Sequence, residues 1–400
     1  MLGWLRFSSH RNVLLLALCQ TLFMSSQTTV AFSAGLVGNM LASDKSLATL
    51  PLTCMIIGVA ASTLPISLYM RRVGRQHGFM TGALLGLIGT ATASLAIWLG
   101  SFWLFCAGMA ALGIYNATCQ YYRFAAADAA EPAYRARAIS YVVAGGVAAA
   151  IIGPELGKWT EPMFPPFAFL GCYIALFLLC LLAMLLQTRL TLPRQSNESL
   201  ASSGRPLAQI ARQPTFIVAA LAGALAFGVM NLVMTATPLA MMACGFATRD
   251  SGTVIQWHAL GMFAPSFVTG HLIQRYGVLN IMAVGAVLLF GCAGFTLAGI
   301  EMMNFLVGNL LLGIGWNFMF IGATTLVTES HSNEERAKVQ GLNEFLVFGT
   351  TATTSFLSGK TLFAGGWTVV NLISLPMTAL GLAAVIWLML HRRSLAARAA

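Results

Sequence analysis

The sequence predicts an all-α membrane protein with twelve transmembrane helices, arranged as two related six-helix bundles. Of its 400 residues, 58% are hydrophobic and only 8% are charged, whereas soluble domains average about 25% charged residues. Twelve apolar stretches reach the length of about 20 residues that a helix needs to cross a bilayer. One long polar segment, 189–214, separates six of these stretches from the other six.

The expected domains follow from that polar segment. Residues 1–188 form an N-terminal bundle, 189–214 a cytoplasmic linker and 215–400 a C-terminal bundle. The twelve expected spans lie near 12–37, 47–69, 78–99, 102–127, 137–157, 164–187, 215–242, 250–273, 278–299, 304–328, 339–359 and 366–390.

The basic residues fix an expected orientation. With the N-terminus in the cytoplasm, 18 of the 22 Lys and Arg residues fall on the inner side, and only Lys45, Lys158, Arg249 and Lys360 fall outside. Cytoplasmic loops of membrane proteins are enriched in Lys and Arg. We therefore expect a multi-pass protein of the inner (plasma) membrane with both termini in the cytoplasm. The net charge of +10 has the same explanation, so no nucleic-acid partner is expected.

The two halves repeat each other in sequence. The stretch "RRVGR" recurs as "QRYGV", which places Gly74 and Gly277 203 residues apart. Asp128 stands seven residues before "RARA", as Glu329 stands seven residues before "RAKV", which begins at Arg336. Parallel halves of this kind are typical of one large class of secondary transporters.

These motifs resemble those of the major facilitator superfamily over the whole chain. The family's loop after its second span reads G-x-x-x-D-R-x-G-R-R. Here "SLYMRRVGRQ" keeps Arg72, Gly74 and Arg75, while Arg71 replaces the aspartate. The resemblance implies a twelve-span transporter that works by alternating access, with no cofactor and a monomer as the working unit.

A second motif bears on the direction of transport. The fifth span ends in "AAIIGPELGK", which is similar to the G-x-x-x-G-P-x-x-G-G motif of the superfamily's antiporters. Gly153, Pro154 and Gly157 match it, whereas Ala149 and Lys158 depart from it. This motif favours export over import.

The resemblance also implies a substrate cavity between the halves, lined mainly by spans 1, 4, 7 and 10. These spans carry narrow polar faces, although hydrogen bonding between helices explains any one amide as well as substrate contact does. They offer no carboxylate at mid-depth, which a lipophilic cation would need, so a neutral or anionic amphipathic solute is favoured. The candidate substrate-binding residues are Gln20, Gln27, Asn116, Gln120, Arg123, Asn231, Met234, Trp316, Asn317 and Phe320.

Charged and titratable residues within spans are expensive and tend to be functional. Arg123 is expected as a buried cation that binds a substrate anion or pairs with Asp128 or another gating residue. His258 and Glu344 are candidates for proton coupling, since histidine titrates near neutral pH. The alternatives are a neutral hydrogen-bonded histidine and a structural glutamate.

Arg71 suggests a gate. The resemblance implies that this position lies where span 2 meets span 11, near the N-terminus of that helix. An arginine there would meet the positive end of the helix, so we expect it to pair with Glu344 as a cytoplasmic latch. The alternative is that Arg71 extends to the lipid headgroups. The candidate gating residues are Arg71, Arg72, Gly74, Arg75, Asp128, Gly153, Pro154, Glu329 and Arg336.

Taken together, these features predict proton-coupled export of a small neutral or anionic organic solute. Two alternatives stay open, a multidrug efflux antiporter for lipophilic cations and a proton-driven importer of a metabolite or vitamin. An enzyme is not expected, because the six histidines are scattered and no metal-ligand spacing occurs. No ATP-binding P-loop is present, which leaves protons as the expected partner ion.

Overall fold

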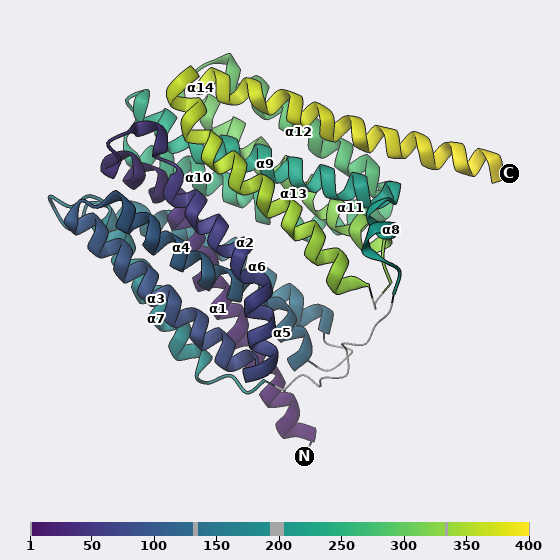
Figure 1. Cartoon of the computed structure of the whole chain (residues 1–400), viewed down its shortest axis with the longest axis horizontal. Coiled ribbons are helices and arrows are strands. Elements are labelled where there is room, and N and C mark those ends of the chain that lie inside the picture. The colour runs from purple at the N-terminus through teal and green to yellow at the C-terminus, as the bar shows by residue number, and fades with distance from the viewer. Residues whose placement is uncertain (1, 131–134, 193–203, 333–334, 400) are drawn as a thin grey trace. The chain divides into compact units, whose positions relative to one another are not determined.

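A computed structural model describes residues 2–130, 135–192, 204–332 and 335–399, and within these ranges all regular secondary structure is helical (Figure 1). A 3₁₀ turn, η1 (Lys45–Leu47), precedes the second helix. The α-helices are α1 (Leu2–Leu41), α2 (Leu50–Val73), α3 (Arg75–Leu99), α4 (Phe102–Cys119), α5 (Tyr122–Ala129), α6 (Arg135–Thr160), α7 (Leu170–Gln187), α8 (Leu207–Ala211), α9 (Pro214–Ala243), α10 (Thr248–Phe263), α11 (Ser266–Tyr276), α12 (Val278–Ala298), α13 (Met302–Glu329) and α14 (Arg336–Ala399).

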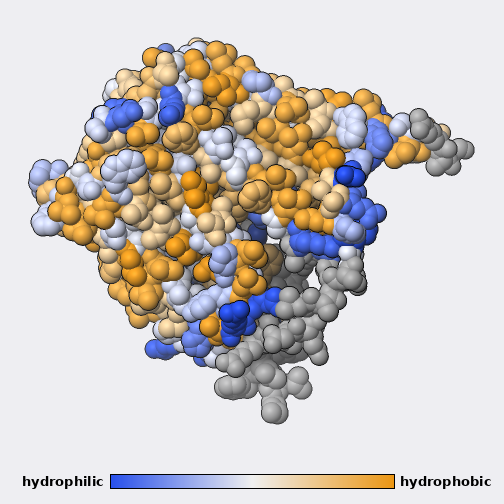
Figure 2. Space-filling model, in the orientation of Figure 1, coloured by the Kyte–Doolittle hydropathy of each residue, from blue (hydrophilic) through white to orange (hydrophobic). Residues whose placement is uncertain are grey.

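The described part of the chain contains nine helical segments that are long and apolar enough to cross a membrane. Hydrophobic residues cover much of the surface visible in Figure 2. Trp103 and Phe345 are among the large apolar side chains that lie exposed, at 69% and 71%. Such exposure is unfavourable in water and is what a lipid-facing surface requires.

Two expected spans share the single long helix α14. At 1.5 Å per residue its 64 residues would reach about 96 Å, which is roughly three times the thickness of a bilayer core. The backbone leaves the helical path at Gly366, with φ 75° and ψ −178°. The expected loop over 360–365 is wrong, because the helix of span 11 continues up to this glycine.

Two other expected spans are interrupted. Span 4 divides into α4 and α5 at Gln120 and Tyr121, and span 8 divides into α10 and α11 at Ala264 and Pro265. Proline lacks the N–H that would continue the helical ladder, which accounts for the second break. The expectation of continuous helices over 102–127 and 250–273 is therefore wrong.

The helices group into two compact units. Unit 1 comprises residues 1–197 with 251–256, and unit 2 comprises 198–250 with 257–400. The boundary at 197 lies within the polar segment 189–214. In unit 1, α6 packs on α1, while α2 and α3 both pack on α4. In unit 2, α14 packs on α9, and α12 packs on α13.

The internal repeat is confirmed at the level of the backbone. Gly74 joins α2 to α3 with φ 89° and ψ 154°, and Gly277 joins α11 to α12 with φ 86° and ψ 147°. Residues other than glycine rarely adopt such a positive φ. A Cβ on Gly113 of α4 would overlap with the carbonyl oxygen of Met55, and one on Gly313 of α13 with that of His258. The two units thus repeat both the tight turn and the close helix crossing.

Candidate functional site

Two predicted substrate-binding amides meet inside unit 1. Asn116 of α4 donates a hydrogen bond from Nδ2 to Oε1 of Gln27 on α1, at 2.8 Å. Asn116 is only 1% exposed, and its Oδ1 has no hydrogen-bond partner among the described residues. Gln27 and Gln20, seven residues apart on α1, are both half-buried. A buried acceptor left unpaired costs about 1–3 kcal/mol, so this pair retains capacity for one further donor.

Arg123 differs from its expected setting. The polar face predicted for Asn116, Gln120 and Arg123 requires one continuous helix, but α4 ends at Cys119 and α5 begins at Tyr122. Gln120 is half-buried at the end of α4, whereas the Arg123 side chain is exposed. Its guanidinium carbon lies 4.9 Å from the centre of the Phe124 ring, within range of a cation–π interaction. The expected burial is wrong; a role in binding a substrate anion stays a prediction.

Three aromatic rings cluster in unit 2. Trp316 and Phe320 of α13 stack with ring centres 4.8 Å apart and planes 13° from parallel. Phe227 of α9 meets both rings edge-on, at 5.0 Å and 5.1 Å. Trp316 is 6% exposed, and its indole Nε1 has no hydrogen-bond partner among the described residues. The cluster combines flat apolar faces with an unused donor.

Phe227, on span 7, was not among the residues predicted from the sequence. The available signal was its spacing, because it precedes Asn231 by four residues and therefore lies on the same helical face. Met234, one turn beyond Asn231, is half-buried.

The two asparagines of unit 2 that were predicted to bind substrate hold helices together. Asn231 of α9 donates to the backbone oxygen of Thr351 on α14 at 3.1 Å. Asn317 of α13 donates to the Met262 backbone oxygen at 2.7 Å and to Ser266 Oγ at 2.6 Å, and it accepts from Thr269 Oγ1 at 2.7 Å. These bonds join the carboxyl end of α10 and the start of α11 to α13, which favours an interhelical role for Asn317.

The two candidates for proton coupling both lie in unit 2. His258 of α10 is 1% exposed, and its Nδ1 lies 2.9 Å from the backbone oxygen of Asn309. Its Nε2 has no hydrogen-bond partner among the described residues. Glu344 is half-buried on α14. Their proton coupling stays a prediction, as does the latch between Arg71 and Glu344, which belong to different units.

Two of the predicted gating residues of unit 1 form an ion pair. Arg75 Nη2 lies 2.6 Å from Asp128 Oδ2 on α5. Arg75 begins α3 directly after the turn at Gly74. Arg71 and Arg72 occupy the last turn of α2, where Arg71 is half-buried and Arg72 is exposed. The turn thus places Arg75 next to Asp128, whereas the Arg72 side chain lies on the surface.

The corresponding acid of unit 2 has a different partner. Glu329, at the end of α13, accepts from Arg392 Nη2 at 2.7 Å, and Arg392 also donates to Thr215 Oγ1 at 3.3 Å. Arg336 begins α14, but its side chain lies outside the described part. The repeat therefore preserves a paired acid but not the identity of its cation.

The motif around Gly153 and Pro154 lies along the contact between α6 and α1. A Cβ on Gly153 would overlap with Thr28 Oγ1 and lie 2.5 Å from the backbone oxygen of Ser25. Thr28 and Thr29 donate from their hydroxyls to the backbone oxygens of Ala149 and Gly153, at 3.1 Å and 2.8 Å. Close approach of helices at small residues is a common packing mode in membranes, so the motif has a structural role in this chain.

No group of three or more His, Cys, Asp or Glu side chains capable of holding a metal ion occurs among the described residues. What the described site offers is amides, aromatic rings and an exposed arginine on apolar helices. With two repeated bundles of membrane-spanning helices, these features define a membrane transporter for an organic solute.

The comparisons with known proteins identify the family. The model of the Major Facilitator Superfamily matches residues 15–346 and, in a second match, 251–399. The chain belongs to this superfamily and is a transporter, not an enzyme. Its fold is all-α with the twelve-helix arrangement of the family, as a multi-pass membrane protein.

Individual relatives cover nearly the whole chain. The riboflavin transporter RfnT of Brucella anthropi is 42% identical over 95% of this chain and 96% of its own length. An uncharacterized transporter of the same superfamily from Bacillus subtilis, YdeG, is 28% identical over 92% and 91% of the two chains.

Solved structures of low sequence identity share the fold. A D-xylose–proton symporter superposes with a TM-score of 0.72 at 14% identity, covering 95% of this chain and 97% of its own. The nucleoside transporter NupG gives a TM-score of 0.71 at 15% identity, covering 94% and 99%.

Proposed function

We propose that this chain transports riboflavin, or a closely related flavin, into the cell across the inner membrane, driven by the proton gradient. The observation that carries the proposal is the 42% identity with the riboflavin transporter of Brucella anthropi over nearly the full length of both chains. The proposal corresponds to the vitamin importer that the sequence left as an alternative.

The chemistry of the two units supports a flavin. Its ring system is planar and largely apolar, and the stacked pair Trp316 and Phe320 offers flat faces of the same kind. Its pyrimidine edge carries a donor between two acceptors. The amide pair Gln27 and Asn116 can complement such an edge, since Asn116 retains an unused acceptor.

Export was favoured mainly by the motif around Gly153. That motif is accounted for by the packing of α6 on α1, so it gives no reason of its own to prefer export. A lipophilic cation would require a carboxylate partner in an apolar setting, and the amide and aromatic groups described above supply none.

Binding is tested first, with purified protein and free riboflavin. Flavin fluorescence is quenched when the ring stacks on an indole, so titration should show saturable quenching. Trp316→Leu should weaken binding by about tenfold or more, since stacking on an aromatic ring contributes about 1–3 kcal/mol. Trp387→Leu is the matched control, because Trp387 is 50% exposed on α14 and stacks on His391 instead.

Direction and coupling are tested in proteoliposomes. Riboflavin should accumulate against its gradient when the pH difference is directed inward, and a protonophore should abolish accumulation. Accumulation of riboflavin only under the opposite pH gradient would favour export over import. Absence of riboflavin binding, together with binding of lipophilic cations, would overturn the proposal in favour of multidrug efflux.

A further inference from the structure

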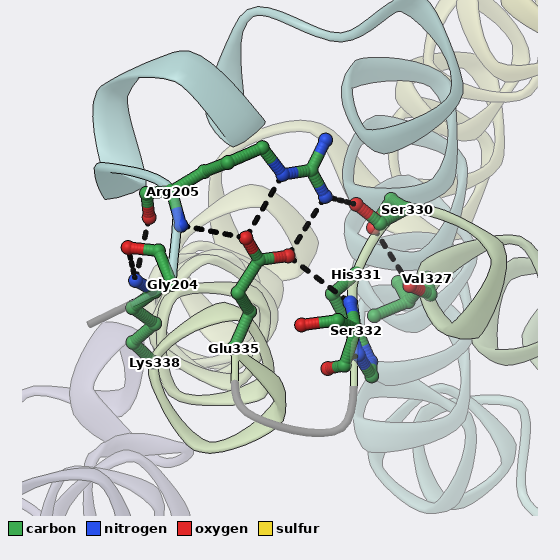
Figure 3. Close-up of polar contacts among 8 residues, drawn as sticks. All are labelled: Gly204, Arg205, Val327, Ser330, His331, Ser332, Glu335 and Lys338. Carbon is green, nitrogen blue, oxygen red and sulfur yellow. Dashed lines mark hydrogen bonds and ion pairs between the residues drawn. The ribbon is translucent and has the colours of Figure 1, made fainter. Parts of the chain in front are cut away.

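A buried carboxylate in unit 2 holds the end of the polar segment that joins the two halves (Figure 3). The side chain of Glu335 is only 3% exposed. It accepts hydrogen bonds from Arg205 Nε at 2.8 Å and from Arg205 Nη2 at 2.7 Å. The backbone N–H groups of Arg205 and Ser332 donate to it as well, at 2.7 Å and 3.0 Å. Bidentate, charge-assisted bonds of this kind are the strong ones, and four donors saturate the carboxylate.

The main chain beside Arg205 is held too. Lys338 Nζ donates to the backbone oxygens of Gly204, at 3.0 Å, and of Arg205. Arg205 Nη2 reaches the backbone oxygen of Ser330 at 3.2 Å. Gly204 lies so close that a Cβ there would be 2.5 Å from Glu335 Cγ. Residues 204–205 are therefore fixed to the segment before α14 through both side chains and backbone.

The same carboxylate stands directly before α14, which begins at Arg336. It accepts a hydrogen bond from the backbone N–H of Ser332, three residues earlier. An anion is also favoured at the positive end of a helix. The Arg205 guanidinium, followed by the Ser332 N–H, holds the pKa of Glu335 well below its usual range. The charge of this group is thus present throughout the physiological pH range.

A separate set of hydrogen bonds within unit 1 holds the other end of the polar segment 189–214. Asn12 of α1 is 3% exposed, donates from Nδ2 to the backbone oxygen of Thr191 at 2.8 Å, and accepts from the Thr191 N–H at 3.1 Å. Arg11 Nη2 adds a bond to the backbone oxygen of Arg189 at 3.2 Å. The chain leaving α7 is therefore fixed to α1 as far as residue 191.

We propose that Arg205 and Glu335 act as a strap that makes the end of the polar segment, from residue 204, part of unit 2. Asn12 and Arg11 hold the beginning of the same segment, as far as residue 191, to unit 1. This device is independent of which solute the protein carries.

Hydrogen exchange followed by mass spectrometry on the full-length protein in lipid nanodiscs tests the strap. Arg205→Ala and Glu335→Gln should each speed exchange over 204–212 by about tenfold or more, given the strength of hydrogen bonds to charged groups. The first turn of α14 should stay protected in both variants, because its backbone hydrogen bonds, such as that from the Val339 N–H to the backbone oxygen of Glu335, do not involve the carboxylate. Glu335→Ala should release 204–212 as well.

Glu329→Gln is the matched control, because it removes another acid of unit 2 that is paired with an arginine and should leave 204–212 unchanged. Asn12→Ala should speed exchange only around 189–192. Unchanged exchange over 204–212 in both Arg205→Ala and Glu335→Gln would overturn the strap. Faster exchange spread evenly over all peptides of unit 2 would overturn it as a local device.

Discussion

Arg75 and Asp128 form the ion pair that joins the start of α3 to α5, with Nη2 and Oδ2 2.6 Å apart. The equivalent acid of unit 2, Glu329, meets no arginine from the matching turn, because Val278 follows Gly277 where Arg75 follows Gly74. Arg392, far along α14, supplies the cation instead. The two halves thus keep a paired acid at the end of the corresponding helix by different routes.

The two pairs should differ in their contribution to stability. In the first pair the Arg75 side chain is 13% exposed and that of Asp128 43%, whereas in the second both Glu329 and Arg392 are exposed, at 41% and 39%. Asp128→Asn leaves a largely buried guanidinium without its counter-charge, which should cost about 1–3 kcal/mol. Glu329→Gln should cost less than about 1 kcal/mol, as solvent-exposed pairs do.

Thermal unfolding of both variants in the same detergent measures this difference. Asp128→Asn should lower the melting temperature by several degrees and Glu329→Gln by much less. Equal losses would mean that burial of Arg75 does not determine the strength of the pair.

The fold was predictable because it depends on patterns that are local in sequence. Apolar stretches of membrane length mark the spans, and Gly277 repeats the turn of Gly74. The break at Pro265 was also visible in principle, since proline interrupts a helix. The break at Gln120 and Tyr121 was not, because neither residue breaks helices; a contact distant in sequence, from Tyr121 Oη to the backbone oxygen of Thr63, accompanies it.

The candidate site was predictable only in part. Sequence shows which spans carry polar residues, but the partner of each depends on how the helices are rotated and crossed. Asn116 and Asn317 look alike in sequence, at the same place in the two repeats. In the structure Asn116 keeps an unused acceptor, whereas Asn317 is occupied by Met262, Ser266 and Thr269.

That contrast gives a second prediction. Asn317→Ala should lower the stability by about 1–3 kcal/mol, since it leaves the half-buried Ser266 and Met262 groups without their donor and the buried Thr269 hydroxyl without its acceptor. Riboflavin affinity of the folded protein should stay within about twofold, a change below 0.5 kcal/mol. Asn280→Ala is the control, because this exposed residue of α12 donates its hydrogen bond to the nearby backbone oxygen of Tyr276, at the end of α11. Weakened binding at an unchanged melting temperature would instead assign Asn317 to the substrate.

A third prediction concerns the contact between α1 and α6. Gly153→Ala should destabilise unit 1 by about 1–3 kcal/mol, the usual cost of overpacking, because the added methyl group overlaps with Thr28 and approaches the Ser25 backbone. Gly349→Ala provides the comparison: it lies inside helix α14 with no atom within 4 Å of an added Cβ. It should be neutral or stabilise by about 0.5–1 kcal/mol, as removal of a helical glycine does.

Melting temperatures and riboflavin uptake of the two glycine variants decide the matter. Loss of uptake in Gly153→Ala with a normal melting temperature would point away from packing and towards a gating role for the motif. Loss of both, with Gly349→Ala unaffected, is the outcome that packing requires.

The fourth prediction is a pH dependence of the strap at Glu335. Hydrogen bonding to Arg205 lowers the pKa of Glu335 in the folded protein below its ordinary value of 4.5. A group whose pKa is depressed by folding stabilises the folded state above its unfolded pKa and loses that contribution as the pH falls. The stability difference between the wild type and Glu335→Gln should therefore be constant from about pH 5.5 to 8 and shrink below about pH 4.5.

Melting curves recorded from pH 3.5 to 8 for the wild type, Glu335→Gln and Glu329→Gln test this. The difference in stability between the wild type and Glu335→Gln should narrow only at the acidic end. There the side chain at position 335 is neutral in the unfolded state of both proteins. Folding of the wild type must then release a proton to form the charged pair, so the carboxylate contributes less to stability. A difference that instead changes between pH 6 and 8 would mean that Glu335 titrates near neutrality. In that case Glu335 would lose its charge as the pH falls through neutrality, and the Arg205 pair would not hold the polar segment under physiological conditions.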